Sequence, residues 1–132
     1  RVLLAEDHEV NQMVALRVLS AFGIAAELAV NGEEALKLAK AQHFDAILMD
    51  CQMPVMDGYE ASQAIREWER TTDGKHIPII AMTANALSGD RARCLAAGMD
   101  DHIAKPFRRE ALGATLAKWI RSETSDSARR EA

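Results

Sequence analysis

The chain has 132 residues, of which 48% are hydrophobic and 27% are charged, and its net charge is -4. These values are typical of one ordinary globular domain with a single core. The negative charge argues against a nucleic-acid-binding surface, and no apolar run reaches the roughly 18 residues that a membrane span needs. Cys51 and Cys94 match neither a metal-binding pattern nor a disulfide framework, and no signal peptide is visible. We therefore expect a reduced, cytoplasmic chain.

Strand-like apolar runs and helix-like segments alternate five times along the chain. The strand patterns cover residues 2–5, 24–30, 45–50, 77–82 and 102–104, and the helical patterns cover residues 10–22, 32–42, 57–70, 87–97 and 107–120. Asn31 is a good N-cap, and Glu34 completes a variant of the capping box. Strict alternation predicts an α/β domain in which helices cover both faces of a five-stranded, doubly wound parallel sheet.

The ends of the chain bear on domain organisation. We expect one domain over residues 1–121, followed by a disordered tail or linker over residues 122–132, which has no apolar anchor. The chain opens on Arg1 and enters a strand pattern at once, which predicts a segment of a longer polypeptide. The other parts of that parent, a membrane anchor among them, are left open. This segment itself is expected to contact no membrane and no nucleic acid.

Polar residues lie where the predicted strands end. Glu6 and Asp7 follow the first strand, Asp50 ends the third, Thr83 follows the fourth and Lys105 follows the fifth. Because the carboxyl ends of parallel strands meet at one edge of the sheet, these side chains should converge. Three crowded carboxylates repel one another and favour a hard cation, and oxygen ligands suit Mg²⁺. The ammonium and the hydroxyl suit the oxygens of a transferred phosphoryl group.

Four short motifs then carry a resemblance to a known family. They are Glu6-Asp7, Met49-Asp50 with Met53-Pro54-Val55-Met56-Asp57-Gly58, Met82-Thr83-Ala84, and Gly98-Met99-Asp100-Asp101 through Lys105-Pro106. In this order, and at strand ends, they resemble the receiver domain of two-component response regulators, over residues 1 to about 121. The stretches at residues 6–12 and 100–106 most resemble receivers fused to hybrid sensor histidine kinases. The resemblance implies a flavodoxin-like (βα)5 fold with strand order 2-1-3-4-5.

The resemblance also implies a phosphorelay chemistry. Asp50 would accept a phosphoryl group from the phosphohistidine of a histidine kinase or histidine phosphotransfer domain, with Lys105 and Thr83 contacting that group. The implied Mg²⁺ ligands are all oxygen atoms: Glu6, Asp7, Asp50 and the backbone carbonyl of Gln52. This domain would catalyse only its own phosphorylation and dephosphorylation, while the parent chain would be a hybrid histidine kinase. Dimerisation is left open.

Further roles follow from the same resemblance. Thr83 would move to hydrogen-bond the phosphoryl group, and His102 stands where the family usually has a Tyr or Phe that follows this movement. A smaller, titratable ring predicts a weakened switch. Gln52 and Asn85 would flank the path of the hydrolytic water and tune the lifetime of the phosphoryl group. The peptide bond before Pro106 would be cis and turn the preceding Lys105 into the site.

The first predicted helix has more apolar surface than one buried face needs. Its apolar residues are Val10, Met13, Val14, Leu16, Val18, Leu19 and Phe22. Two interpretations stay open: the helix is deeply buried, or a strip of it docks a helix of a histidine-bearing partner.

Several residues receive structural interpretations. Asp57-Gly58 is typical of a helix start, Cys51 of small core packing, and the charges in residues 66–70 of a solvated helix face. Asp100 and Asp101 are read as loop and helix-flanking charges, and His76 as a solvated surface residue.

Three other functions compete with a phosphoaccepting receiver. A degenerate receiver could act mainly as a protein-interaction module, but the complete set of polar strand-end residues argues against it. An aspartate-nucleophile phosphatase needs a second Asp two residues after the nucleophile, and this chain has Gln52 there. A nucleotide or flavin carrier would need a phosphate-binding loop after the first strand, where Glu6 and Asp7 would repel phosphate.

Overall fold

The computed structural model describes residues 1–72, 76–83, 88–104 and 108–121. The strands are β1 (Val2–Ala5), β2 (Ala26–Ala29), β3 (Ala46–Asp50), β4 (Ile79–Thr83) and β5 (Asp101–Ala104). The helices are α1 (Glu9–Ala21), α2 (Gly32–Ala41), α3 (Gly58–Thr72), α4 (Ser88–Ala96) and α5 (Arg109–Leu116), which continues as the π-helical segment η1 (Ala117–Arg121).

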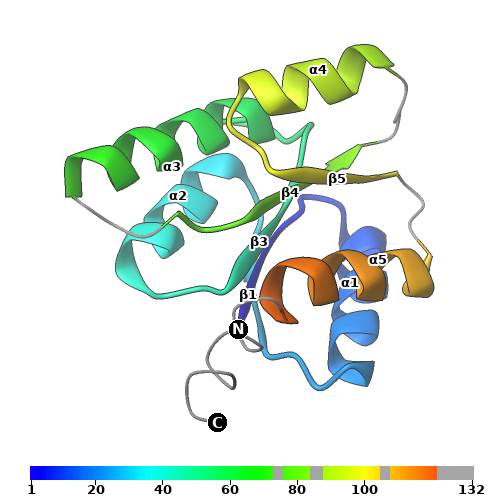
Figure 1. Ribbon diagram of the computed structural model, residues 1–132. Helices are drawn as coiled ribbons and strands as arrows, with labels where there is room; N and C mark the ends of the chain where they lie inside the picture. The colour runs from blue at the N-terminus through cyan, green and yellow to red at the C-terminus, as the bar shows by residue number, and fades with distance from the viewer. Residues whose placement is uncertain (73–75, 84–87, 105–107, 122–132) are drawn as a thin grey trace, which may run out of the picture.

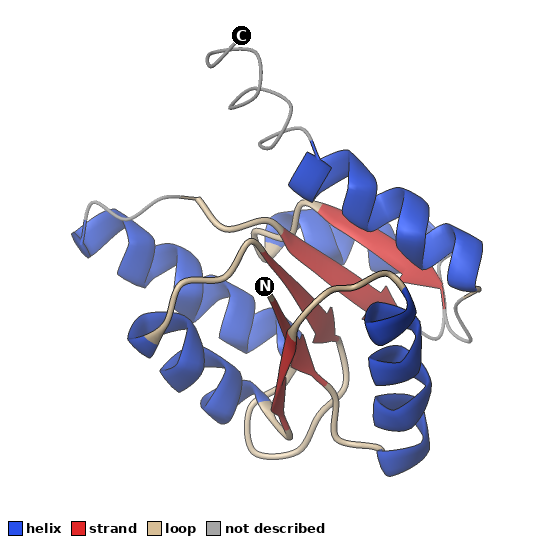
Figure 2. Cartoon of the chain, turned by 90° about the horizontal axis from the view of Figure 1, so that it is seen from below, coloured by secondary structure: helices blue, strands red, loops and turns tan. Residues whose placement is uncertain are grey.

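The five strands form one parallel sheet in the order β2-β1-β3-β4-β5. Helices α1 and α5 cover one face, and α2, α3 and α4 cover the other (Figure 1). Figure 2 shows the strands as a middle layer between the helices. The predicted fold class and strand order are confirmed. Because every strand runs in the same direction, all carboxyl ends share one edge, which we call the carboxyl edge, and all amino ends share the other, the amino edge.

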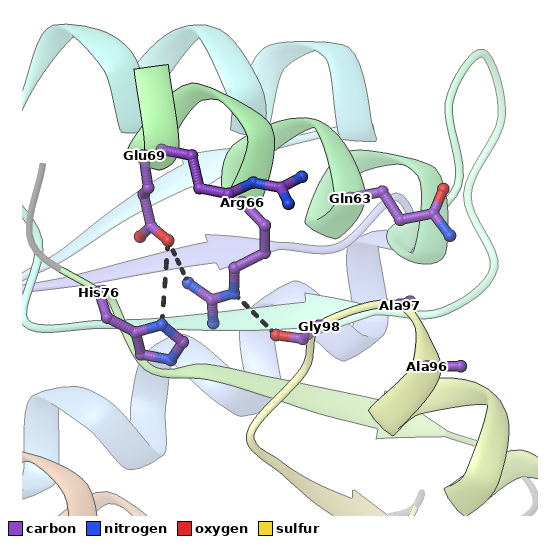
Figure 3. A pocket seen from close by; sticks show the side chains of 8 residues that line it. Gln63, Arg66, Glu69, His76, Ala96, Ala97 and Gly98 are labelled. Carbon is purple, nitrogen blue, oxygen red and sulfur yellow. Dashed lines mark hydrogen bonds and ion pairs between the residues drawn. The ribbon is translucent and has the colours of Figure 1, made fainter. Parts of the chain in front are cut away.

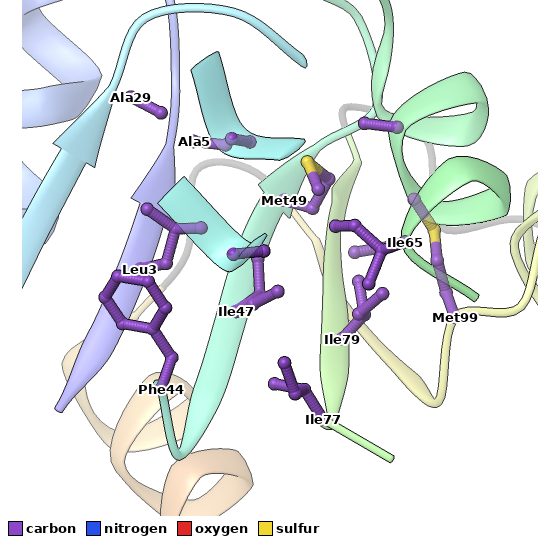
Figure 4. Close-up of a cluster of buried hydrophobic side chains, with 14 of the residues drawn as sticks. Leu3, Ala5, Ala29, Phe44, Ile47, Met49, Ile65, Ile77, Ile79 and Met99 are labelled. Atoms are coloured by element: carbon purple, nitrogen blue, oxygen red, sulfur yellow. The ribbon is translucent and has the colours of Figure 1, made fainter. Parts of the chain in front are cut away.

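The apolar runs of the central strands are buried on both faces. Every residue of β1, β3 and β4 is buried. Alternate side chains point to opposite faces, so the sheet separates two apolar clusters. One contains Leu3, Ile47 and Ile79 and lies against α2 and α3 (Figure 4). The other contains Leu4, Leu48 and Ile80 and lies against α1 and α5.

Local signals in the sequence fix two helix starts. The Asn31 side chain accepts the Glu34 amide at 2.9 Å, and the Glu34 carboxylate accepts the amide of Val30 at 3.1 Å. The Asp57 side chain accepts the Glu60 amide at 2.9 Å, which places Asp57 at the start of α3. The capping interaction at Asn31 and the helix start at Asp57-Gly58 are therefore confirmed.

Some boundaries differ from the predicted ones. The second strand is only Ala26–Ala29, and α3 continues to Thr72 instead of ending at residue 70. The extension has a local cause, because the hydroxyls of Thr71 and Thr72 both donate to the carbonyl of Trp68, at 3.0 and 2.8 Å. Asp101, read as a flanking charge, is instead the first residue of β5.

Candidate functional site at the carboxyl edge

Three carboxylates meet where β1 and β3 end. Glu6, Asp7 and Asp50 each offer an oxygen atom, and these atoms all lie within 4.8 Å of one another. We call these three residues the acidic cluster. Asp50 is the last residue of β3, and the parallel pairing of β1 with β3 brings the three residues together. The convergence predicted from strand ends is therefore present for the carboxylates.

The members of the acidic cluster differ in exposure. Glu6 and Asp50 are buried, whereas Asp7 faces solvent. The Glu6 carboxylate accepts the amide of His8 at 3.1 Å, and the Asp50 carboxylate accepts the amide of Gln52 at 3.3 Å. Each amide lies two residues after the carboxylate that it contacts, so local backbone fixes the orientation of both buried side chains. Asp7 keeps the cluster open to solvent.

Gly58 fits against the backbone of the phosphoacceptor candidate. A Cβ atom at position 58 would lie 2.2 Å from the carbonyl oxygen of Asp50 and 3.0 Å from Cα of Cys51. The Gly58 amide also donates to the Cys51 carbonyl at 3.1 Å. The start of α3 thus packs directly on the end of β3, which only a residue without a side chain allows. The sequence marked Gly58 only as a helix start.

Thr83 and His102 lie on neighbouring strands. Thr83 is buried at the end of β4 and pairs with Ala104, and His102 pairs with Ala81. Residues two apart on a strand share a face, so Thr83 and His102 lie on the same face of the sheet, the one covered by α4. His102 is partly exposed. The predicted switch pair is thus placed on adjacent strands.

Other predicted site residues have different outcomes. Gln52 is exposed just after β3. Lys105, Pro106 and Asn85 lie outside the described residues, as does the predicted tail at 122–132. Their roles stay predictions.

The two cysteines, 43 positions apart in the sequence, meet beside the site. Their Sγ atoms are 3.9 Å apart, and both residues are buried. Burial raises the pKa of the Cys51 thiol to about 12, with smaller contributions of the same sign from Cys94 and Asp50. A thiol of this kind stays protonated near neutral pH and is a poor nucleophile. Core packing, the interpretation taken from the sequence, fits this environment.

Helix α1 leaves apolar side chains in solvent. Val10 is 59% exposed and Met13 57%, and Val14 and Phe22 are also exposed, while Ala15 and Leu19 point into the core. Deep burial of the whole helix is therefore wrong. Val10 lies in the first turn of α1, only a few residues after Glu6 and Asp7. An apolar strip thus begins beside the acidic cluster.

A second group of charged residues lies at the amino edge. We call Arg66, Glu69, His76 and Asp100 the Arg66 cluster. The Arg66 guanidinium donates to Glu69 and to Asp100, each at 2.7 Å, and to the carbonyl of Gly98 at 2.8 Å. His76 Nε2 lies 2.7 Å from the Asp100 carboxylate. Figure 3 shows the Arg66, Glu69 and His76 side chains turned toward one another beside Gly98.

The Arg66 cluster corrects the interpretation of the charges in residues 66–70 and adds partners to two other residues. Arg66 and Glu69 form a largely buried ion pair and not a solvated helix face, although Arg70 and Glu67 beside them are exposed. Asp100 holds the start of β4, since its carboxylate also accepts the Ile79 amide at 2.8 Å. His76 is exposed, as the sequence predicts, and it also pairs with Asp100. A cavity of about 580 Å³ opens over this cluster, but all of the acidic cluster lies at the opposite edge.

The comparison with known families decides the assignment. Residues 2–117 match the model of the response regulator receiver domain family. The chain belongs to this family. The resemblance inferred from the motifs is confirmed, and receiver domains of this kind serve two-component phosphorelay signalling.

The curated relatives of this receiver domain are much longer proteins. It is 43% identical over 124 residues to hybrid signal transduction histidine kinase K of Dictyostelium discoideum, covering 91% of this chain and 10% of that protein. It is 36% identical over 119 residues to sensor histidine kinase GacS of Pseudomonas protegens, covering 90% of this chain and 13% of that protein. The receiver domain thus spans a small part of the length of the hybrid kinases that it matches.

Two solved structures are informative relatives. The receiver domain of sensor histidine kinase PA1611 from Pseudomonas aeruginosa, with magnesium in its active site cleft, is 49% identical with a TM-score of 0.82, covering 90% of this chain and 95% of that one. A structure of the Ssk1 receiver domain from Saccharomyces cerevisiae with the histidine phosphotransfer protein Ypd1 also matches. The identity is 31% and the TM-score is 0.88, and the match covers 92% of this chain and 89% of that one.

Within the described residues, no helix is long and apolar enough to cross a membrane.

Proposed function

We propose that this receiver domain accepts a phosphoryl group from a phosphohistidine onto Asp50 and passes the signal on through Thr83 and His102. The observation that carries the proposal is the acidic cluster: a buried aspartate at the end of β3 with two further carboxylates whose oxygens lie within 4.8 Å. A carboxylate of this kind can attack phosphorus and form an acyl phosphate. The leaving imidazole takes up a proton as the P–N bond breaks.

The acidic cluster fits Mg²⁺ by the chemistry of its donors. Its three carboxylates are hard oxygen ligands, and no thiol or imidazole belongs to the group. Glu6, Asp7 and Asp50 would hold the ion, together with the backbone carbonyl of Gln52, which directly follows the β3 end. Bound there, the ion would supply positive charge to the phosphoryl oxygens. The magnesium in the active site cleft of the PA1611 receiver domain supports this assignment.

The residues of the chain contribute mainly by position. The Gln52 amide orients the Asp50 carboxylate, and the tight contact of Gly58 fixes the backbone that carries it. Thr83 ends the neighbouring strand β4, one residue after the partner of Asp50, and we expect its hydroxyl to contact a phosphoryl oxygen after a small movement. Lys105, which lies outside the described residues, is the predicted ammonium partner of the same oxygens. Gln52 and Asn85 are the predicted determinants of phosphoryl lifetime.

The exposed strip on α1 supports a histidine-bearing helical partner. Val10, Met13 and Val14 present apolar surface to solvent directly after the acidic cluster. A partner helix that covers this strip would bring a phosphohistidine over the carboxyl edge. The Ssk1 receiver domain was solved with the phosphotransfer protein Ypd1, and the curated relatives are hybrid kinases, so a histidine phosphotransfer domain and a hybrid-kinase parent fit best.

His102 gives the switch an unusual side chain. Phosphorylation adds negative charge and three acceptor oxygens beside Thr83, and a movement of Thr83 would open space on the face that His102 shares. The imidazole fills less of that space than a Tyr or Phe ring would, so we expect a weak conformational response. His102→Tyr should enlarge the change in hydrogen exchange of β5 on phosphorylation. An unaltered exchange pattern would contradict this role.

The proposal is tested by locating the phosphoryl group. The chain is incubated with Mg²⁺ and a phosphorylated histidine phosphotransfer protein, and the adduct is mapped by mass spectrometry. We expect a single adduct at Asp50 that Asp50→Ala abolishes. Asp57→Asn is the matched control, because Asn caps the start of α3 as well as Asp does and the adduct should persist. An adduct that survives Asp50→Ala, or none in the wild type, would refute the proposal and favour an interaction module.

A further inference from the structure

The sulfur atoms of this chain are divided unevenly between its core and its surface. The sequence has six methionines and two cysteines, and all of them lie within the described residues. Most are buried in the core or half-buried against it: Met49, Cys51, Met53, Met56, Met82, Cys94 and Met99. Met13 is the exception, because it is 57% exposed and belongs to neither apolar cluster. A reagent in solution that attacks sulfur therefore meets Met13 first.

Met13 lies inside the apolar surface of helix α1. Val10 comes one helical turn before it and Val14 directly follows it, and these two residues are 59% and 45% exposed. Residues three or four positions apart share one side of a helix, so Val10, Met13 and Val14 form one continuous apolar surface, which we call the α1 strip. The exposed thioether thus stands in the surface to which the proposed function assigns a histidine-bearing helix.

A peroxide can oxidise an exposed thioether without any further reactant. The lone pair of the sulfur bonds to one oxygen of hydrogen peroxide, and the O–O bond breaks. The second oxygen departs as hydroxide and becomes water when it takes the proton from the oxygen that stays on sulfur. Sulfur is oxidised, the peroxide is reduced, and the product is methionine sulfoxide.

We infer that Met13 is an oxidation site at which a peroxide controls the docking of the histidine-bearing partner. The sulfoxide is polar where the thioether is apolar. A helix that covers the α1 strip would bury the sulfoxide oxygen, and the side chains of Val10 and Val14 offer that oxygen no hydrogen-bond donor. Oxidation should therefore weaken the complex.

The effect should stay confined to docking. Because Met13 packs in neither apolar cluster, its oxidation should not unfold the chain. The acidic cluster contains no sulfur, so the reaction at Asp50 with a small phosphodonor should be unchanged. Conversely, a partner helix that covers the α1 strip should shield the Met13 sulfur and slow its oxidation. The inference rests on the proposed function, since it regulates the docking step of that function.

The test combines limited oxidation with a binding measurement. The chain is treated with hydrogen peroxide until most molecules have gained a single oxygen atom, catalase removes the peroxide, and peptide mass spectrometry locates the sulfoxide. Ypd1, the histidine phosphotransfer protein solved with the Ssk1 receiver domain, is the probe, and calorimetry measures its binding. We expect the sulfoxide at Met13 and a rise of about tenfold in the dissociation constant for Ypd1. Methionine sulfoxide reductases should restore binding.

Three variants separate the sulfur atom from the shape of the side chain. Met13→Leu keeps an apolar side chain of similar size, so it should bind Ypd1 as the reduced wild type does and should not respond to peroxide. Met13→Gln places a polar amide at this position and should bind weakly before any oxidation. Met56→Leu is the matched control, because Met56 is half-buried against the core, and this variant should keep the peroxide response of the wild type.

Several results would overturn the inference. They are a sulfoxide that forms first at another methionine, a Met13 sulfoxide that leaves Ypd1 binding unchanged, and a peroxide-induced loss of binding that persists in Met13→Leu. A reduced wild type that does not bind Ypd1 would also overturn it. Phosphorylation of Asp50 by acetyl phosphate is measured separately. If that reaction failed, the proposed function would be refuted, while the binding measurement would still decide the role of Met13.

Discussion

Carboxylates lie at both edges of the sheet, but their surroundings differ. At the amino edge, Glu69 and Asp100 share the guanidinium of Arg66. Each also accepts a backbone amide at 2.8 Å: Glu69 from Ile77, just before β4, and Asp100 from Ile79, its first residue. At the carboxyl edge, three carboxylates bring oxygens within 4.8 Å of one another. The first arrangement shares one guanidinium between two carboxylates, and the second brings three carboxylates together.

This difference separates a structural role from a functional one. Burial of a carboxylate is costly unless a cation or several hydrogen bonds compensate it. The Arg66 cluster meets that cost with chain atoms and ties α3 to the start of β4 and to the turn before β5. The acidic cluster gathers like charges, which a fold does not need for stability and which a bound cation would relieve. The two edges should therefore respond in opposite ways when a charge is removed.

The largest effect is expected at Arg66. In Arg66→Met the methylene stem is kept, but Glu69 and Asp100, whose side chains are 7% and 16% exposed, lose their shared cation. Removing one partner of a buried ion network costs about 3–5 kcal/mol of unfolding free energy. Urea denaturation measures the change. Arg70→Met is the control, because the Arg70–Glu67 pair is exposed and such pairs contribute about 0–1 kcal/mol. Equal effects of the two variants would refute the distinction between the edges.

The opposite response is expected at Asp7. Asp7→Asn removes one of three crowded carboxylates, so the melting temperature without Mg²⁺ should stay the same or rise. With Mg²⁺ at about 100 times its dissociation constant, the wild type should gain about 2.7 kcal/mol, because the ion binds the folded state. Asp7→Asn should lose most of that gain, and Asp57→Asn, outside the acidic cluster, should retain it. Thermal unfolding at constant ionic strength, with and without Mg²⁺, measures both effects. A Mg²⁺ response that persists in Asp7→Asn would place the metal elsewhere.

The two edges also differ in how far the sequence could predict them. The acidic cluster follows from strand ends alone, because parallel strands must bring Asp50 beside Glu6 and Asp7. The Arg66 cluster has no such signal. Arg66 reaches Gly98 and Asp100, which lie 32 and 34 positions away in the turn before β5. A charged residue late in a helix is therefore interpreted as solvated until the position of that turn is known. The contact between Cys94 and Cys51, which are 43 positions apart, could not be predicted from the sequence for the same reason.

Local chemistry was predictable where it involves neighbours in sequence. Asn31 caps α2 as its spacing with Glu34 predicts. The exposure of α1 was not decided by its pattern, because an apolar side chain at a helical position fits either a core or a partner. Only the placement of α1 over the sheet shows that Val10 and Met13 point to solvent. The position of α1 in the fold thus decides between two interpretations that the spacing of its apolar residues left open.

A smaller effect is expected from crowding at the carboxyl edge. In Gly58→Ala the new Cβ would lie 2.2 Å from the Asp50 carbonyl oxygen, so the backbone must shift, at a cost of about 1–3 kcal/mol. Gly23→Ala is the comparison, because nothing lies within 4 Å there and only its positive φ of 73° opposes a side chain, at about 1 kcal/mol. Chemical denaturation measures both. Gly58→Ala should also slow phosphorylation of Asp50, and Gly23→Ala should not. Equal phosphorylation rates in the two variants would show that the contact with Asp50 serves stability alone.

The smallest effect concerns Asp101, a carboxylate of the amino edge that lies outside the Arg66 cluster. Partial burial acts to raise its pKa, but hydrogen bonds from the Trp119 indole at 3.0 Å and the His102 amide at 2.8 Å, with the charge of Lys118, lower it below the ordinary 3.8. Because the folded-state pKa is the lower one, the ionised carboxylate stabilises the fold fully above pH 3.8 and loses this contribution as the pH falls through the folded-state value. Asp101→Asn should therefore be less stable than wild type by the same small amount at pH 7 and at pH 5.

The stability difference between wild type and Asp101→Asn should then shrink below pH 4, where the wild-type carboxylate is protonated as well. Urea unfolding followed by tryptophan fluorescence at a series of pH values measures the difference, and taking it between two variants cancels the acid sensitivity of all other groups. Asp101 differs from Glu69 and Asp100 in that its strongest partners are neutral donors, an indole and an amide, and Lys118 nearby is mostly exposed. If the stability difference between wild type and Asp101→Asn grew as the pH fell, the ionised Asp101 carboxylate would be destabilised by its surroundings. Asp101 would then resemble the carboxylates of the acidic cluster and not those of the Arg66 cluster.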